Sequence, residues 1–148
     1  MSQPTIEKYL YIMQKSFCIG LSKPFWTNIT AELTKMPKAY FFDLGFRNAL
    51  LNNFDTIKER LDNGQFFENV VWREYVIKYG LDKVKYWRTQ HKNEVDLIIE
   101  EKKAYEVKFN KNLIKESKYK LFKQKYPNIP LEFITFDDVL ERIVYANF

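Results

Sequence analysis

The 148-residue sequence is poor in the residues that mark disulfide-rich, repetitive or disordered chains. Its one cysteine, Cys18, has no partner for a disulfide. Four glycines and five prolines leave no flexible or low-complexity tract, while aromatic residues make up 18% of the chain. The only histidine, His91, lies in a polar turn, where a solvated side chain is expected. At this length a chain buries roughly 70% of its unfolded surface, so one ordinary domain or one domain with a small lobe is expected.

Long apolar runs are also lacking. No stretch approaches the ~18 apolar residues of a membrane span, and the N-terminus lacks the uninterrupted apolar segment of a signal peptide. A lone cysteine fits a reducing compartment. We therefore expect a cytoplasmic protein without a membrane partner.

Negative charge is scarce in one part of the chain. Nine lysines and only two glutamates lie between Lys102 and Lys125, in a protein with a formal net charge of +5. Such a segment fits a surface that binds a polyanion such as DNA, and it equally fits an ordinary solvated helix. The candidate phosphate contacts are Arg88, at the end of a predicted strand, and Lys111, Lys115 and Lys118.

Hydrophobic periodicity predicts a mixed α/β fold. The most distinct helix covers residues 64–79, with a buried ridge of Phe67, Val70, Val71 and Glu74 and a stop at Gly80. Three strands joined by short turns follow, which predicts an antiparallel meander. The expected order is a helix at 4–17, short strands near 17–21 and 39–42, helical pieces over 46–63, the 64–79 helix, strands at 83–89, 94–100 and 104–109, a lysine-rich helix at 113–126, a strand at 131–136 and a short terminal helix containing Val139, Leu140 and Ile143.

This order suggests two regions. Residues 1–62 are expected to form an N-terminal lobe of a helix and short strands, a possible winged-helix remnant and junction. Residues 63–148 are expected to form the main α/β unit.

Acidic residues interrupt two of the predicted strands. Because side chains alternate along a strand, Val95, Leu97 and Ile99 should share one face, and Asp96 should lie on the other face with Glu94 and Ile98. On the following strand, Glu106 and Lys108 should lie opposite Tyr105, Val107 and Phe109. Asp96 and Glu106 are therefore expected to line up on one face of the sheet.

Two neighbouring carboxylates need a cation or a shared proton. At 4 Å and an effective dielectric constant near 20, they repel by roughly 4 kcal/mol. Magnesium, or manganese, suits carboxylate oxygens together with a phosphate. Such an ion would bind Asp96 and Glu106, activate water and polarise a phosphodiester, while Lys108 would orient the nucleophile or stabilise the developing charge. The alternative is a solvated ladder of ion pairs on the open face of a sheet.

An aspartate, a spacer of about ten residues and then Glu-x-Lys resembles the PD-(D/E)XK nuclease superfamily. The pattern reads "EVD" at 94–96 and "EVK" at 106–108. The resemblance implies a restriction-endonuclease-like core of a helix, a three-stranded meander, a helix and a strand. It also implies that Asp96, Glu106 and Lys108 are catalytic, with Glu68 in "FFEN" as an additional acid on the first helix.

A broader resemblance covers most of the chain. The stretches "TIEKYLYIMQKSFCI", "MPKAYFFDLGFRNAL", "GQFFENVVWREY", "YWRTQHKNEVDLII" and "AYEVKF" are similar to the C-terminal region of predicted prokaryotic AAA+ ATPases. The sequence has no G-x-x-x-x-G-K-[ST] loop, so we expect no ATP site in this chain. The resemblance implies an ATPase domain in cis or as a partner. It leaves two functions open, a magnesium-dependent DNA nuclease and a catalytically inactive nucleic-acid-binding or protein-interaction module.

Overall fold

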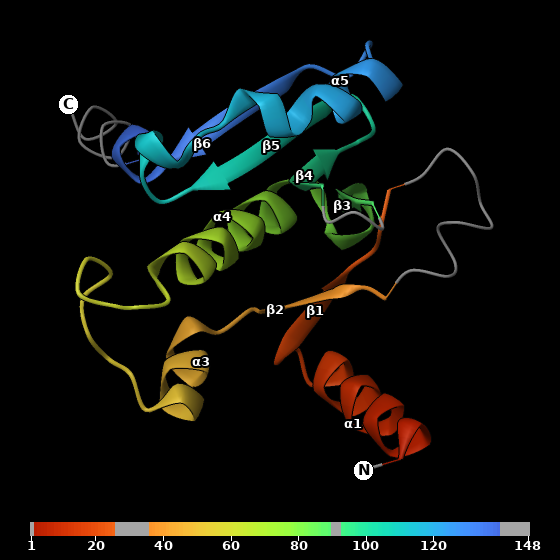
Figure 1. Ribbon diagram of the computed structural model, residues 1–148. Coiled ribbons are helices and arrows are strands. Elements are labelled where there is room, and N and C mark those ends of the chain that lie inside the picture. Colours follow the sequence, from red (N-terminus) through yellow and green to blue (C-terminus); the bar gives the residue numbers. More distant parts are fainter. Residues whose placement is uncertain (1, 26–35, 90–92, 140–148) are drawn as a thin grey trace.

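The computed structural model describes residues 2–25, 36–89 and 93–139, and it contains a two-stranded and a four-stranded sheet. Figure 1 shows α4 in the middle of the molecule, with the smaller sheet on one side of it and the larger sheet on the other. The elements are α1 (Gln3–Lys15), β1 (Ile19–Ser22), β2 (Lys38–Phe41), α3 (Leu44–Leu51), α4 (Asn63–Tyr79), a 3-10 turn η1 (Leu81–Lys83), β3 (Val84–Arg88), β4 (Glu94–Ile99), β5 (Lys103–Lys108), the 3-10 turns η2 (Lys111–Leu113) and η3 (Glu116–Tyr119), α5 (Lys120–Lys125) and β6 (Leu131–Thr135).

The larger sheet has the strand order β3-β4-β5-β6. Strands β3, β4 and β5 pair antiparallel, as the short turns between them predict. Strand β6 pairs parallel with β5, from Ala104↔Leu131 to Lys108↔Thr135. A parallel neighbour requires a crossover, and residues 109–130, with α5, supply it. The α/β class expected from the sequence is therefore confirmed.

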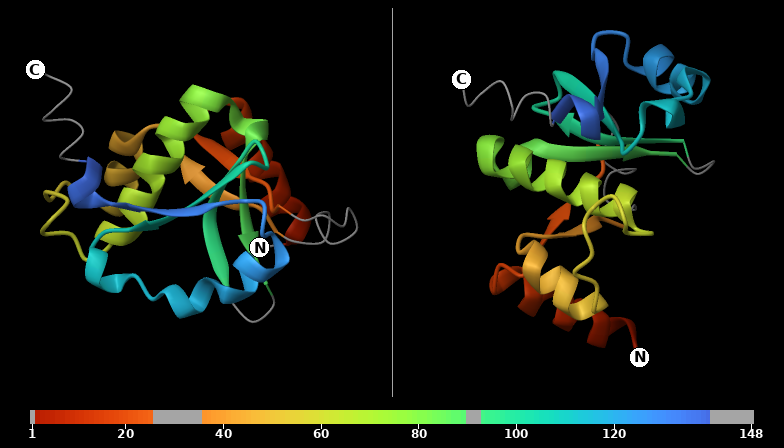
Figure 2. Two further views of the ribbon diagram at one scale, coloured as in Figure 1. Left: turned by 90° about the horizontal axis from the view of Figure 1, so that it is seen from above. Right: turned by 90° about the vertical axis from the view of Figure 1, so that its left-hand side faces the viewer.

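Helix α4 is buried on more than one side. The side view in Figure 2 (right) places it between the larger sheet and the N-terminal elements. Its buried residues are Phe67, Asn69, Val71, Trp72 and Val76. The single ridge predicted from the sequence was therefore partly wrong, since Val70 is half-buried and Glu74 is exposed. A helix with partners on two sides needs a wider apolar surface than a helix that covers one sheet.

The N-terminal hairpin packs closely on α4. Strands β1 and β2 pair antiparallel, with Gly20 opposite Tyr40. The Tyr40 ring stacks on Trp72 with ring centroids 4.6 Å apart. Asn69 fixes the edge of the hairpin, because its side chain accepts a hydrogen bond from the Phe41 amide at 3.0 Å and donates one to the Phe41 carbonyl at 2.7 Å. These contacts hold the hairpin in a defined position against the helix.

The larger sheet has a hydrophobic cluster on each face. One cluster joins α4 to Val84, Leu97, Ile99 and Val107. The other joins Trp87, Val95, Ile98 and Ala104 to the aromatic residues Tyr119, Phe122 and Tyr126 of the crossover. Packing on both faces makes this sheet the centre of the domain.

Two expected helices differ from the structure. The predicted lysine-rich helix at 113–126 is divided into η2, η3 and the six-residue α5, and Tyr119 and Phe122 are buried against the sheet. Residues 136–139 begin the expected terminal helix, but Leu140 and Ile143 lie outside the described residues, as does His91. The predicted helix over 64–79 and the predicted strand over 131–136 are confirmed, as Asn63–Tyr79 and Leu131–Thr135.

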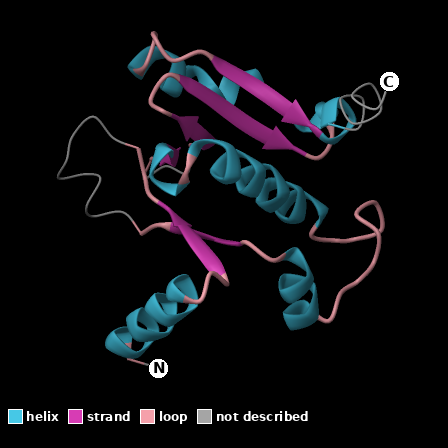
Figure 3. Ribbon diagram, turned by 180° about the vertical axis from the view of Figure 1, so that it is seen from behind, coloured by secondary structure: helices cyan, strands magenta, loops and turns pink. Residues whose placement is uncertain are grey.

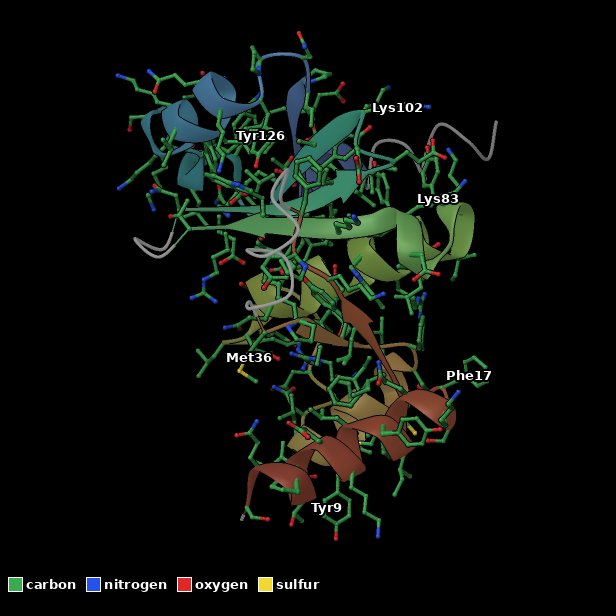
Figure 4. The ribbon with its side chains drawn as sticks, turned by 90° about the vertical axis from the view of Figure 1, so that its right-hand side faces the viewer. Tyr9, Phe17, Met36, Lys83, Lys102 and Tyr126 are labelled. Carbon is green, nitrogen blue, oxygen red and sulfur yellow. The ribbon has the colours of Figure 1, made fainter. Side chains whose placement is uncertain are left out.

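Helix α1 contributes little to the core. None of its residues is buried, and Ile6, Tyr9 and Ile12 are exposed. Tyr9 and Phe17 project from the end of the molecule that lies far from Tyr126 (Figure 4). Within the described ranges, no helix is long and apolar enough to cross a bilayer.

Gly20 provides a test of the packing between the hairpin and α4. A methyl group added there would collide with the Trp72 ring and lie 2.9 Å from the Phe42 ring. We expect Gly20→Ala to lower the free energy of unfolding by roughly 1–3 kcal/mol, because the ring and the backbone must separate. The control is Gly64→Ala in α4, where the added methyl group has nothing within 4 Å and should cause no loss of stability. Urea unfolding of both variants measures the difference, and equal stability would contradict this account of the packing.

Candidate functional site

A bulge in β4 sets the direction of Asp96. Strands β3 and β4 pair at Lys85↔Ile98 and at Trp87↔Val95, so two β4 residues, Asp96 and Leu97, lie opposite the single β3 residue between these pairs. The bulge breaks the alternation of side chains. Val95 and Ile98 pack in the cluster on the α5 side, while Leu97 packs on the α4 side. The predicted arrangement, with Val95, Leu97 and Ile99 on one face, was therefore wrong.

Asp96 lies directly beyond the last pair of β4 and β5. The paired register runs from Ile99↔Lys103 to Leu97↔Tyr105. The Val107 amide then donates a hydrogen bond to Oδ2 of Asp96 at 3.0 Å. The carboxylate thus binds the backbone of β5 between Glu106 and Lys108, and it is only 5% exposed.

Glu106 approaches the same place from the other side of the sheet. Its neighbours Tyr105 and Val107 pack toward α4, and Glu106 accepts a hydrogen bond at 2.9 Å from the Tyr119 hydroxyl of the crossover. Oε1 also pairs with the Lys108 ammonium, which donates to the Val107 carbonyl at 3.1 Å. Oε2 is buried and has no hydrogen-bond partner among the described residues. The sequence predicted that the two carboxylates line one face of the sheet, and this was wrong. They come from opposite faces to the point where β4 and β5 separate.

Lys38 of the hairpin reaches into this acidic group. Its ammonium lies 2.8 Å from Oε1 of Glu68 and 3.4 Å from Oδ1 of Asp96, and it also pairs with Glu94. The Tyr40 hydroxyl donates a second hydrogen bond to Oε1 of Glu68, at 2.5 Å. Seen from behind, β2 runs past α4 on the side away from the larger sheet (Figure 3). The hairpin and α4 thus bring Lys38 and Glu68 to the carboxylates of the sheet.

Burial and mutual repulsion disfavour the charged carboxylates. Burial, followed by the negative charges of Glu68 and Glu106, raises the pKa of Asp96 to about 8, although Lys38 and Lys108 act in the opposite direction. Burial also raises the pKa of Glu106, against the lowering effect of Lys108 and Tyr119. The pKa of Lys38 is raised, because its carboxylate partners outweigh the effect of its own burial. The site holds more negative charge than its lysines compensate.

Solvent reaches the group from the hairpin side. An open pocket of about 430 Å³ is lined by Lys38, Tyr40, Arg47, Gln65, Glu68 and Glu94, among others. Asp96 and Glu106 do not line it. A small ion or a phosphate approaching through this pocket would meet Glu68, Glu94 and Lys38 first.

Two family models match the chain. The "Domain of unknown function (DUF4143)" matches residues 63–138, which is just over half of the sequence and contains Glu68, Asp96, Glu106 and Lys108. The chain belongs to the DUF4143 family. DUF4143 is found in AAA-ATPase-associated proteins. The "Domain of unknown function (DUF8612)" matches residues 1–56, the part that supplies Lys38 and Tyr40.

The curated relatives are longer than this DUF4143 chain. It is 26% identical over 102 residues to "Uncharacterized protein Rv2008c" of Mycobacterium tuberculosis and to "Uncharacterized protein Mb2031c" of Mycobacterium bovis. The match covers 68% of this chain and 23% of each relative, so it spans about a quarter of the length of these relatives. No solved structure matches.

The DUF4143 domain brings four of the predicted residues together and leaves the others outside. Asp96, Glu106 and Lys108 are joined through Val107, and Lys38 joins Glu68 to Asp96. Arg88 lies at the margin, 3.4 Å from Glu94. The lysines proposed as phosphate contacts, Lys111, Lys115 and Lys118, are exposed on the crossover.

Sequence reasoning missed four residues that contact the site: Lys38, Tyr40, Glu94 and Tyr119. Glu94 carries a local signal, since it lies two residues before Asp96 in the same strand. The spacing of Lys38 and Tyr40 places them on one face of β2, but no local pattern connects Lys38 to Asp96, 58 positions further along the chain.

Asp96 and Glu106 suit a hard divalent cation. Both are buried carboxylates with raised pKa values, and one oxygen of Glu106 has no partner in the described part of the chain. Such oxygen ligands match Mg²⁺ and Mn²⁺. Across residues 2–25, 36–89 and 93–139, no three acidic, histidine or cysteine side chains are grouped to hold a metal by themselves. The Lys38 ammonium already occupies the space among the other carboxylates.

The raised pKa of Asp96 predicts a specific dependence of stability on pH. In the unfolded chain its pKa is near 3.9, so the folded protein holds an additional proton between about pH 4 and pH 8. Metal-free protein should therefore lose stability as the pH rises through this window, by at most about 1.4 kcal/mol per pH unit for one proton, and the loss should level off above pH 8. In Asp96→Asn the slope should be smaller, with the remainder due to Glu106. Urea unfolding in EDTA at several pH values tests this, and the same slope in both proteins would count against it.

Proposed function

We propose that the DUF4143 domain of this chain is a PD-(D/E)XK nuclease with a restriction-endonuclease-like core, and that it hydrolyses phosphodiester bonds in DNA with Mg²⁺ or Mn²⁺. The observation that carries the proposal is the meeting of Asp96, Glu106 and Lys108 where β4 and β5 part, with a buried Glu106 oxygen left without a partner among the described residues. The order α4, β3-β4-β5 meander, α5 and β6 supports it, since that order is the one the superfamily resemblance implies.

Asp96 and Glu106 are the residues that would hold the ion. When bound, it would polarise a phosphate oxygen and lower the pKa of a water ligand. The Val107 amide keeps one oxygen of Asp96 directed along β5. Tyr119 holds Oε1 of Glu106, which leaves Oε2 as the available ligand.

Lys108 would act on the substrate side of this pair. Its pKa is raised by Asp96 and Glu106, which outweigh the lowering effect of its own burial, so the ammonium stays charged at neutral pH. About a quarter of its side chain is exposed, while the carboxylate of Glu106 is nearly buried. A charged donor in this position would orient the nucleophile and stabilise negative charge that develops on a phosphate.

Glu68 would contribute indirectly. It accepts hydrogen bonds from Tyr40 and Lys38 and lies close enough to raise the pKa of Asp96. We place it as an additional acid that keeps the site negative and therefore attractive to a divalent ion.

DNA is the proposed substrate, and an ATPase is the proposed partner. Lys111, Lys115 and Lys118 are exposed on the crossover that also carries Tyr119 to the site. A basic surface on the same crossover would attract a polyanion. The association of DUF4143 with AAA-ATPases supports an ATPase domain in cis or in a partner protein. The proposed location is the cytoplasm.

A second function, a nucleic-acid-binding or protein-interaction module without catalysis, has its own support. Asp96 and Glu106 are about 95% buried, and Lys38 already partly neutralises the acidic group. A nuclease fold that has lost its activity would retain the basic crossover.

Cleavage of DNA distinguishes the two functions. Purified protein with Mn²⁺ or Mg²⁺ should cut linear or plasmid DNA, and EDTA should abolish the activity. Glu106→Gln should lose it because one ligand is weakened, and Lys108→Ala because the charged donor is removed, each by at least about 100-fold. The control is Lys123→Ala, which removes an exposed lysine that pairs with Glu116 at 3.5 Å and should retain activity. Equal cleavage by wild type, Glu106→Gln and Lys108→Ala would refute the assigned site.

DNA binding tests the basic crossover separately. Replacing Lys111, Lys115 and Lys118 together by alanine should weaken binding and flatten the dependence of log K on log salt. On duplex DNA the slope should fall by about 0.9 for each phosphate that the variant no longer neutralises. Fluorescence anisotropy at several salt concentrations measures this slope. Salt-sensitive binding without metal-dependent cleavage would favour the non-catalytic function. An unchanged slope in the variant would show that these three lysines do not contact DNA phosphates.

A further inference from the structure

Lys38 lies among three of the four carboxylates of the site, Glu68, Glu94 and Asp96. We propose that the Lys38 ammonium is a built-in cation that fills the space among Glu68, Glu94 and Asp96 and so limits the site to one divalent ion. This inference rests on the proposed function in taking Asp96 and Glu106 as the ligands of that ion.

The contacts of Lys38 resemble those of a bound cation. Oxygens from α4 and from two positions of β4 surround the nitrogen, with Glu68 at 2.8 Å and Asp96 at 3.4 Å. Its side chain is 21% exposed, so little water competes for these partners. Two-metal phosphodiesterases place a second ion about 4 Å from the first, between carboxylates that share it. Here Asp96 is the carboxylate common to both positions: Lys38 lies 3.4 Å from Oδ1, while Oδ2 accepts one hydrogen bond from the Val107 amide and keeps a lone pair for the divalent ion.

The position of Lys38 is fixed by the fold. It pairs with Ser22 across the hairpin, and the hairpin is anchored to the larger sheet by a hydrogen bond from the Ser22 hydroxyl to the Val84 carbonyl at 3.1 Å. The ammonium also lies 5.5 Å from the centroid of the Tyr86 ring, within the range of cation–π attraction. The ammonium is thus held by the hairpin and by the Tyr86 ring as well as by the carboxylates.

The charges agree with a single divalent ion. With all four carboxylates ionised, Lys38 and Lys108 offset two of the charges of Glu68, Glu94, Asp96 and Glu106, while Arg88 pairs with Glu94 only from the solvent-exposed margin, at 3.4 Å. One divalent ion offsets the other two. Without Lys38, three carboxylates would face one another with no ammonium among them, a strongly unfavourable arrangement at low dielectric that a second ion would relieve.

The inference predicts a change in the number of bound ions. Metal-free protein is titrated with Mn²⁺, and free Mn²⁺ is counted by electron paramagnetic resonance. Wild type should bind one ion and Lys38→Met two, since methionine keeps much of the side-chain volume but removes the charge. In EDTA, Lys38→Met should also unfold at a temperature lower by roughly 5 °C, and Mn²⁺ should restore more of its stability than it adds to wild type.

The matched control is Lys83→Met. Lys83 pairs with Glu100 at 2.9 Å at the other end of β3 and β4, so its removal also leaves a carboxylate without its lysine. Figure 4 shows Lys83 near Lys102, beside the turn between β4 and β5. This variant should bind one ion, as wild type does. A second ion in Lys38→Met but not in Lys83→Met would then show binding at the Lys38 position, not non-specific binding to a carboxylate that has lost its lysine.

The outcomes separate this inference from the proposed function. One ion in both wild type and Lys38→Met, or two in both, would overturn the inference and leave the metal-dependent function standing. No ion in wild type would remove the proposed metal site and the inference with it. If Lys38→Met does not fold, the same titration is made on Lys38→Met combined with Glu94→Gln, which relieves part of the repulsion. Two ions in that protein support the inference, and one ion refutes it.

Discussion

The hydrogen bond from the Val107 amide to Asp96 is the interaction on which the rest of the site depends. A backbone amide in this position would ordinarily bond to a carbonyl of the neighbouring strand, and here a carboxylate replaces that carbonyl. The exchange lets β4 and β5 part without leaving a buried donor unsatisfied. It also fixes Asp96 beside Glu106 and Lys108, so the geometry of the carboxylates follows directly from the way the sheet opens.

The point where β4 and β5 separate becomes a site with several charged groups only because α4 and the hairpin pack against it. Trp72 and Asn69 hold the hairpin on one side of the helix, and Phe67 and Val71 hold the sheet on another. This arrangement brings Glu68 and Lys38 to Asp96 from segments that are distant in sequence. Residues matched by two different family models therefore form one electrostatic unit.

The sequence was informative where local patterns determine structure. Apolar periodicity and Gly80 located α4, and the short turns located the β3-β4-β5 meander. The bulge at Asp96 and Leu97 could not be predicted from local pattern. The segment "EVDLII" fits strict alternation as well as a bulged strand, and only its packing on both faces of the sheet distinguishes the two. The division of the 113–126 helix is likewise not visible in local pattern, since the i, i+3 spacing of the buried Tyr119 and Phe122 fits a continuous helix as well as the two short segments that carry them. Lys38 could not be found at all from local pattern, because its partners lie 30 to 58 residues away.

The position of Lys38 limits how the protein can be divided. A fragment that begins at Asn63 would contain Glu68, Asp96, Glu106 and Lys108 and would match the whole DUF4143 model. It would nevertheless expose the surface of Trp72 that the hairpin covers, and Glu68, Glu94 and Asp96 would lose their shared ammonium. The smallest piece of this chain that retains a native site therefore includes the hairpin, although the hairpin lies outside the DUF4143 match.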